Sequence, residues 1–400
     1  MCLPSCNNTT CCCVDSCSVF SLGSVAMGHA FDLILVQSDQ DPSLTNCSDV
    51  NYSFDPLLGV PNCCIGDIGD ADIFLEVENC DIRFPIENNK IKYPASYGQE
   101  ESGYGGHDAK ALKKLTECCS HGEEATRARV VVVAQSNRIL AMAPCYIHFW
   151  SSSDRIFVCD IDGTITKSNL RGLLDTVVTQ QYSYCHDGVC QFLQSLVAKQ
   201  DELSPAYEPT PTIPNIRILY LSSRPLGLAF STRKFLQQLR QEQPISQRVT
   251  SSLGLPRGPL IGFTGSLRQI LVMELMTHSV HEFKARALQR VVNLWNSVDS
   301  SSPRARGEKK INPFWAGLGN TYMDAQAYHE AGMDLQQIYI IDKNSEIRCL
   351  DRNTATEGMP MDRDDYRASQ RTLFPFGYQD KNIIRHILSA KQPDIVSAYI

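Results

Sequence analysis

Short apolar runs separated by polar turns occupy the chain up to about residue 153. They are rich in β-branched and aromatic residues and are bounded by Gly, Asn and Asp, which is typical of strands. The runs lie at residues 31–36, 73–77, 129–133, 139–142 and 146–150. A single helix is predicted among them, over residues 110–119. We therefore expect a β-sandwich in this region, and we interpret His148 as an ordinary strand residue.

The hydrophobic period changes after Asp154, where apolar strand-like runs alternate with amphipathic helical stretches. This alternation predicts an α/β fold, with a parallel sheet covered by helices. The predicted strands are 155–159, 216–221, 314–316 and 338–341. The predicted helices are 188–199, 227–240, 281–295 and 323–331. After residue 341 the chain is largely polar, and one last helix is predicted at about 382–388.

This pattern divides the chain into four segments. They are a Cys-rich disordered leader (1–22), the β-sandwich (23–153), the α/β domain (154–345) and a C-terminal extension (346–400). The net charge of −7 argues against general nucleic-acid binding, which needs a basic face. No apolar stretch approaches the roughly 18 residues of a membrane span, and the start lacks the pattern of a secretory signal.

Cysteine is abundant, but its spacing does not indicate a metal framework. Six of the 17 cysteines fall within the first 17 residues, and no pair of CxxC motifs has zinc spacing. We expect a reducing compartment. The leader is interpreted as disordered or, alternatively, as a site of S-acylation that holds the chain on a membrane. The polar loop 300–310, which contains Arg304, Arg306, Lys309 and Lys310, is a weaker candidate for membrane contact.

The most distinctive chemistry follows the strand 155–159. Asp160 and Asp162 stand two positions apart at its carboxyl end, and Gly163 then allows a turn. Thr164 offers a hydroxyl and an amide to an anion. Ligands of open α/β sheets bind outside the carboxyl ends of strands, which favours a functional site here. The alternative is an acidic turn without function, because Asp and Gly are common in turns.

Two further polar groups follow the same logic. Ser222 and Arg224 come at the end of the strand 216–221, where a hydroxyl and a guanidinium suit an anion. Lys284 lies early in the helix 281–295, where a cation opposes the helix dipole unless it faces an anion. The alternatives are helix capping by Ser222 or Ser223 and a solvated Lys284.

A glycine turn after the strand 314–316 contains Asn320 and leads into a helix with Asp324 in its first turn. Taken alone, Asp324 is interpreted as a helix cap. Together with Asp160 and Asp162, it supplies a third carboxylate at the strand ends. Mg²⁺ prefers oxygen ligands and keeps several waters, so two or three carboxylates suit this ion.

The order and content of these motifs resemble the haloacid-dehalogenase-type phosphatases and, more closely, the lipins, which are Mg²⁺-dependent phosphatidate phosphatases. The resemblance rests on the runs DIDGTITKS at 160–168, YCHDGV at 184–189, LSSR at 221–224 and GNTYMD at 319–324. It covers about 130–350 well, and the strand 31–36 resembles the N-terminal lipin region more loosely. The chain departs from the lipin pattern at Asn169, Pro225 and Thr321.

The resemblance implies a fold and a set of roles. The expected fold is a Rossmann-like, haloacid-dehalogenase-like catalytic domain with an N-terminal immunoglobulin-like β-sandwich packed on it. Asp160 is expected to be the nucleophile and Asp162 the general acid and base. Mg²⁺ is expected on Asp160, the Asp162 backbone carbonyl and Asp324, with a contact from Asn320. The residues expected to bind phosphoryl oxygens are Gly163, Thr164, Ser222, Arg224 and Lys284.

The implied activity is hydrolysis of phosphatidate to diacylglycerol and phosphate by a cytoplasmic protein peripheral on the endoplasmic reticulum or another membrane. One rival is a phosphatidate-binding membrane sensor without activity, since some relatives lack the catalytic acids. This chain retains Asp160, Asp162 and Asp324. A second rival is a phosphatase for a soluble phosphoester. The sequence indicates no oligomeric state.

Overall fold

The computed structural model describes most of the region that the sequence assigns to strands and helices. The described residues are 26–27, 29–39, 45–47, 71–87, 90–92, 109–119, 125–168, 172, 175, 180–198, 215–246, 249–263, 280–299, 311–351 and 363–389. The leader (1–22), Asn169 and the loop 300–310 lie outside them, so the hypotheses about these segments stay predictions.

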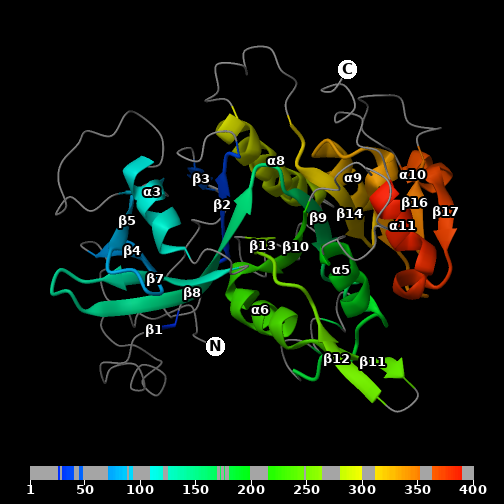
Figure 1. The fold of residues 1–400 in the computed structure, drawn as a ribbon, viewed down its shortest axis with the longest axis horizontal. Coiled ribbons are helices and arrows are strands. Elements are labelled where there is room, and N and C mark those ends of the chain that lie inside the picture. The colour runs from blue at the N-terminus through cyan, green and yellow to red at the C-terminus, as the bar shows by residue number, and fades with distance from the viewer. Residues whose placement is uncertain are drawn as a thin grey trace, which may run out of the picture.

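Eight N-terminal strands form one mixed sheet, at the left in Figure 1. They are β1 (Ala26–Met27), β2 (Leu33–Gln37), β3 (Thr45–Cys47), β4 (Asp72–Val77), β5 (Arg83–Glu87), β6 (Lys90–Ile91), β7 (Thr126–Val133) and β8 (Ile139–Ser151). Their order is β3-β2-β8-β7-β4-β5-β6, with β1 pairing to β8. The helix α3 (Ala109–Cys118) shares a hydrophobic core with this sheet. The described strands make one sheet, so the predicted immunoglobulin-like sandwich is not confirmed.

The runs predicted at 139–142 and 146–150 are parts of a single strand, β8. Its residues 139–147 pair with β7, and residues 147–151 pair in parallel with β2. Because the intervening residues 143–145, which are Ala, Pro and Cys, also pair with β7, the gap between the two runs does not end the strand.

The second sheet contains seven strands in the order β13-β10-β9-β14-β15-β16-β17. They are β9 (Arg155–Asp160), β10 (Ile216–Pro225), β13 (Leu260–Phe263), β14 (Phe314–Gly319), β15 (Ile338–Ile341), β16 (Ile347–Leu350) and β17 (Gln370–Phe374). The strands from β13 to β15 are parallel, as the sequence predicted for β9, β10, β14 and β15, whereas β13 itself was not predicted. The sequence missed β16 and β17, which add antiparallel strands beyond residue 345. It also missed the hairpin of β11 (Arg240–Ser246) and β12 (Val249–Gly254).

Helices cover both faces of the second sheet (Figure 1). They are α5 (Val189–Val197), α6 (Ala229–Gln238), α8 (Val280–Asp299), α9 (Tyr322–Glu330), α10 (Arg363–Ser369) and α11 (Lys381–Ser389), with short 3₁₀ turns η5 (Leu226–Leu228), η8 (Leu335–Gln337) and η10 (Gly377–Gln379). Buried residues of α5, α6 and α11 belong to one hydrophobic core, and those of α8 and α9 belong to another. This arrangement places the chain in the α/β class.

The strand β9 is the first of the second sheet in the sequence and lies near its centre. The next strands in the sequence, β10 and β13, lie on one side of it, and the following strands, β14 and β15, lie on the other. The direction in which successive strands are added to the sheet therefore reverses at β9. Such a switch point leaves a crevice at the carboxyl ends of the strands, where ligands of open α/β sheets bind.

The N-terminal sheet packs directly on the α/β part. Ile34 and Trp150 belong to the same buried core as α8, and the Trp150 ring lies 6.0 Å from the Trp295 ring. The buried Asp32 carboxylate forms an ion pair of 2.9 Å with Arg233 of α6. These contacts join segments that are more than a hundred residues apart in the sequence.

Two observations bear on the environment of the protein. A disulfide joins Cys80 to Cys118, in contrast to the reduced cysteines that we expect from the sequence. None of the helices described here is long and apolar enough to cross a membrane.

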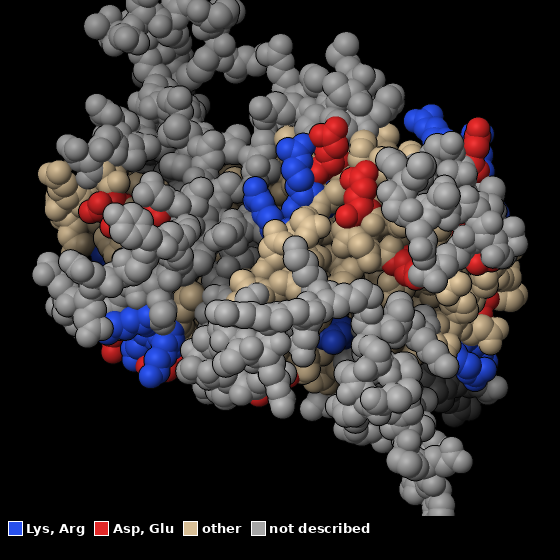
Figure 2. All heavy atoms as spheres, turned by 90° about the horizontal axis from the view of Figure 1, so that it is seen from above, with Lys and Arg blue, Asp and Glu red and all other residues tan. Residues whose placement is uncertain are grey.

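Figure 2 shows the molecule from above the view of Figure 1. Lys and Arg side chains lie next to Asp and Glu side chains near the centre of the face seen there. The described residues there do not form a patch of one sign.

Candidate active site

The loop that follows β9 is compact and begins with Asp160. The strand residues before it are fully buried, and its backbone turns at Gly163, whose φ of 82° favours glycine. The Ile161 carbonyl accepts hydrogen bonds from the N–H groups of Thr164, Ile165 and Thr166. These bonds hold the loop tightly against the end of the strand.

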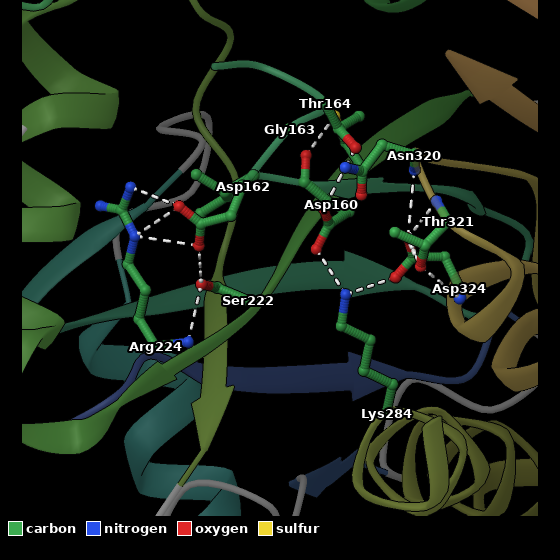
Figure 3. A network of polar contacts seen from close by, with 12 residues as sticks. Asp160, Asp162, Gly163, Thr164, Ser222, Arg224, Lys284, Asn320, Thr321 and Asp324 are labelled. Atoms are coloured by element: carbon green, nitrogen blue, oxygen red, sulfur yellow. Dashed lines mark hydrogen bonds and ion pairs between the residues drawn. The ribbon is translucent and has the colours of Figure 1, made fainter. Parts of the chain in front are cut away.

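Asp160, Lys284 and Asp324 form a buried cluster of three charges. The Lys284 Nζ lies 2.6 Å from Asp160 Oδ1 and 2.5 Å from Asp324 Oδ1. Figure 3 shows the two carboxylates reaching the ammonium from β9 and from the first turn of α9. The lysine therefore faces anions, which resolves the conflict with the dipole of α8. Two carboxyl groups meet one ammonium, so the cluster carries an excess of negative charge when both acids are ionised.

The two carboxylates of this cluster have different proton affinities. Burial raises the pKa of Asp160 to about 7, against the opposing effect of Lys284. Burial also acts on Asp324, but Lys284 and several hydrogen bonds overcome it and lower the pKa of that carboxyl. Asp324 accepts bonds from the N–H groups of Asn320 and Thr321, whereas Asp160 Oδ2 accepts one from the Thr164 hydroxyl. Hydrogen bonds to a carboxylate favour its charged form.

Asp324 serves the helix and the cluster at the same time. Its Oδ2 forms a capping box with Thr321 at the start of α9, while its Oδ1 contacts Lys284. The sequence offered the cap and the functional role as alternatives, and the two oxygens of one carboxylate satisfy both. Thr321 is one of the departures from the lipin pattern, and it acts here as the N-cap residue.

Asp162 points away from the lysine and toward Arg224 (Figure 3). The Arg224 Nε and Nη2 atoms contact the Asp162 carboxylate at 3.0 and 2.7 Å, and the Ser222 hydroxyl donates to it at 3.2 Å. A planar guanidinium matches a carboxylate in this fork geometry. Arg224, expected to bind phosphate, therefore holds Asp162 in this structure. Ser222 does not cap α6, whose N-cap residue is Leu228.

Gly163 and Thr164 were expected to bind phosphoryl oxygens. In the structure, the Gly163 N–H donates to the Thr166 hydroxyl at 3.1 Å, and the Thr164 N–H donates to the Ile161 carbonyl. The Thr164 hydroxyl donates to Asp160 at 3.1 Å. These bonds shape the loop and orient Asp160.

The residues present fit a magnesium ion by the chemistry of their donors. The described residues contain no group of three or more His, Cys, Asp or Glu side chains that could hold a metal. Asp160 and Asp324, however, already converge on one cation, and their excess negative charge suits a second positive charge. Two carboxylates with a backbone carbonyl and waters are a common Mg²⁺ environment. Asn320 lies beside Asp160 in Figure 3, consistent with its expected place near this ion.

The sequence missed several residues that support the loop. The Tyr378 hydroxyl donates to the Thr164 carbonyl at 2.7 Å, although 214 residues separate the two. Thr166 accepts the Gly163 N–H through its hydroxyl. The position of Thr166 within the run DIDGTIT could have suggested its role, whereas no local signal points to Tyr378.

His186 and Thr232 are further supports. The backbone N–H of His186 donates to the Ile165 carbonyl, and the ring Nδ1 of His186 lies 2.7 Å from the Ser345 hydroxyl. Burial lowers the pKa of His186 to about 4, which makes it neutral at pH 7. The Thr232 hydroxyl accepts from Arg224 at 3.3 Å. His186 lies just before α5, Thr232 lies in α6 and Ser345 lies in the turn between β15 and β16, so three separate segments support the end of β10 and the loop that follows β9.

Comparison with known proteins identifies the family to which this region of the chain is similar. A family model described as LNS2 (Lipin/Ned1/Smp2) matches residues 120–360. Phosphatidate phosphatase PAH1 of Arabidopsis thaliana is 27% identical over 54% of this chain, a stretch that covers 20% of that protein. Nuclear elongation and deformation protein 1 of Schizosaccharomyces pombe is 27% identical over 52% of this chain and 26% of its own length. Phosphatidate phosphatase LPIN1 of Homo sapiens is 24% identical over 50% of this chain and 18% of its own length.

The similarity thus spans only about a fifth to a quarter of these relatives. Within this chain, the match includes the whole stretch from Asp160 to Asp324. The acids, the arginine fork and the buried lysine all lie inside it. The chain belongs to the LNS2 (Lipin/Ned1/Smp2) family.

Proposed function

We propose that this protein is a Mg²⁺-dependent phosphatidate phosphatase that acts through an aspartyl-phosphate. The observation that carries the proposal is the buried Asp160 carboxylate, which ends β9 and contacts Lys284 at 2.6 Å. Asp162 stands two residues away on the same loop. The names of the relatives support the choice of substrate.

The first step transfers the phosphoryl group to the enzyme. An oxygen of Asp160 forms a bond to phosphorus, and the bond between phosphorus and the glycerol oxygen breaks. Asp162 gives a proton to the leaving alkoxide, which becomes the hydroxyl of diacylglycerol. For this role Asp162 must first exchange its contacts with Arg224 and Ser222 for the leaving oxygen.

The second step releases phosphate. A water molecule attacks phosphorus, Asp162 takes the proton of that water, and the bond between phosphorus and Asp160 breaks. Asp160 thereby regains its carboxylate and Asp162 its proton. One residue serves as acid in the first step and as base in the second, which general acid–base catalysis by a carboxyl group permits.

The remaining residues orient these two acids and offset negative charge. The Lys284 ammonium stabilises the Asp160 carboxylate and phosphoryl oxygens near it. Ser222 lies beside Asp162 and is within reach of the same phosphoryl group. The Thr164 hydroxyl holds Oδ2 of Asp160 and the Lys284 ammonium holds Oδ1, so the attacking oxygen has to exchange one of these contacts for phosphorus. In this scheme Gly163 and Arg224 position the loop and Asp162.

Asp160, Asp324 and the Asp162 backbone carbonyl would hold the Mg²⁺ ion, with Asn320 nearby. When bound, the ion supplies positive charge that offsets the negative charge of the phosphoryl group. Asp324 suits this position because its hydrogen bonds and Lys284 lower its pKa and keep it charged.

At the level of the fold, the proposal assigns the second sheet to a haloacid-dehalogenase-like domain. The N-terminal sheet would correspond to the immunoglobulin-like element of that family. The protein would meet phosphatidate as a cytoplasmic, peripheral protein at the endoplasmic reticulum or another membrane.

The test is release of phosphate from phosphatidate in detergent micelles, with and without Mg²⁺. We expect turnover only with Mg²⁺, and loss of turnover in Asp160→Asn, because an amide is a poor nucleophile. The matched control is Asp187→Asn, an exposed acid that forms an ion pair of 3.5 Å with Lys167. Full activity of Asp160→Asn would overturn the mechanism. Binding of phosphatidate without turnover would instead identify a lipid sensor.

A further inference from the structure

Four large hydrophobic side chains are exposed among the described residues, and two of them, both phenylalanines, lie at the same edge of the second sheet. They are Phe230, Ile311, Leu373 and Phe376. Phe230 follows the carboxyl end of β10, and Phe376 follows that of β17, which runs in the same direction as β9. Both phenylalanines therefore lie at the edge of the sheet that carries Asp160. Ile311 precedes β14 and lies at the opposite edge.

Phe376 is held outward by a turn that is anchored to the active site. It is 73% exposed, although Gly377 and Tyr378 after it are buried. Tyr378 donates its hydroxyl to the Thr164 carbonyl. Gly377 has a φ of 52°, and a Cβ atom there would lie 1.9 Å from the Ser345 carbonyl oxygen. The turn cannot fold its phenylalanine inward without breaking these contacts.

Phe230 has a corresponding place on the other side of the site. It is the second residue of α6 and is 52% exposed. Two residues later, Thr232 contacts Arg224, which in turn holds Asp162. Each exposed phenylalanine thus stands two residues from a side chain that contacts the catalytic loops.

Two exposed lysines accompany Phe376. Lys343 lies in the turn between β15 and β16, two residues before Ser345, and Lys381 begins α11. No carboxylate of the described residues lies within ion-pair distance of either ammonium. Cations near a membrane surface are attracted to anionic lipids, each by about 1 kcal/mol. Exposed aromatic rings flanked by lysines have the composition of an interfacial anchor.

We propose that Phe230 and Phe376 insert into the surface of a lipid bilayer, with Lys343 and Lys381 beside the anionic head groups. This inference rests on the proposed function, because it explains how the site meets a lipid substrate. The active site lies between the two phenylalanines, so a flat surface that receives both also faces Asp160. A protein partner bound across both phenylalanines would cover the active site, which the substrate has to enter.

The first experiment measures binding of the full chain to vesicles of phosphatidylcholine and phosphatidylserine by flotation. The variant Phe230→Ser/Phe376→Ser should bind about tenfold more weakly for each phenylalanine removed, given the usual gain from burying this side chain. The control is Ile311→Ser, which removes an exposed apolar side chain at the opposite edge and should bind as the wild type does. A far-ultraviolet spectrum and melting curve establish that each variant is folded.

The second experiment detects insertion directly. The three native tryptophans are buried, at 3%, 0% and 6% exposure for Trp150, Trp295 and Trp315. In Phe376→Trp, vesicles with brominated acyl chains should quench and blue-shift the new fluorescence. Ile311→Trp should show no such change. Unchanged vesicle binding by the double serine variant, or equal quenching at positions 376 and 311, would overturn the proposal.

These vesicles contain no phosphatidate, which separates the inference from the proposed function. If the wild type binds through the phenylalanines but releases no phosphate from phosphatidate, the proposed membrane-binding surface is supported and the proposed function is refuted. If phosphate is released and the double variant binds vesicles as the wild type does, the proposed function is supported and the proposed membrane-binding surface is refuted.

Discussion

Replacing Lys284 with methionine tests whether the buried charge cluster is organised as the structure indicates. Methionine keeps most of the length of the side chain and removes its charge. The ammonium and both carboxylates are at most 5% exposed, so water cannot replace the lost partner. Burial alone would lower the pKa of Lys284, but the two carboxylates raise it, which means that the lysine is charged in the folded protein.

The expected loss of stability is large. Removing one partner of a buried ion pair typically costs about 3–5 kcal/mol, because the remaining charge stays buried. The matched control is Arg286→Met on the same helix, whose side chain is 72% exposed and pairs with Glu282 at 2.8 Å. A surface pair of this kind contributes about 0–1 kcal/mol, so the two variants should differ severalfold in their effect.

The assay is urea unfolding at neutral pH in the presence of a chelator, followed by tryptophan fluorescence. A second series with Mg²⁺ should recover more stability in Lys284→Met than in the wild type, because the variant has the larger uncompensated negative charge. Turnover should fall about a hundred- to a thousandfold, as for loss of one group that stabilises developing charge. If Lys284→Met costs no more than Arg286→Met, the cluster is not organised around this lysine.

Three further predictions follow from individual contacts. Asp324→Asn should keep the cap of α9 and the fold but raise the Mg²⁺ concentration needed for phosphate release; a normal Mg²⁺ titration would contradict its role as a ligand. Tyr378→Phe should lose about 1–3 kcal/mol in urea unfolding, because the buried Thr164 carbonyl loses its donor, and a wild-type midpoint would refute this. Burial, the largest cause, lowers the pKa of His148 to about 4, from 6.5 in the unfolded chain. Stability should therefore fall by about 3 kcal/mol between pH 6.5 and 4, where only the unfolded chain takes the proton. His148→Phe should flatten that slope, and an unchanged slope would assign the loss to other groups.

The sequence predicted β9, β10, β14 and β15 of the second sheet because these strands are buried on both faces. Such strands appear as continuous apolar runs, and the helices between them show a clear apolar face. β15 was predicted with its observed ends, and β9 was one residue longer than predicted. Three strands of this sheet were missed, namely β13, β16 and the edge strand β17. Gly262 interrupts the apolar run of β13, Arg348 interrupts that of β16, and Thr372 and Leu373 of β17 are exposed, which weakens the apolar signal.

His148 shows how a local pattern can be correct and incomplete. It is a residue of β8, as predicted, but it is also buried on the side of the strand that faces Asp32 and Arg233. The residues of a segment do not show which strands and helices will pack against it. Only the packing of the two sheets places this imidazole among charged groups.

For the active site, the sequence determined which residue types stand at the ends of β9, β10 and β14. Since parallel strands bring their carboxyl ends to one edge, that information was enough to expect the acids to meet. It did not determine which charge contacts which. The tertiary structure pairs Lys284 with Asp160 and Asp324, and gives Asp162 to Arg224. Those pairings depend on side-chain direction and on the approach of α8, which bring together residues 40 to 124 positions apart.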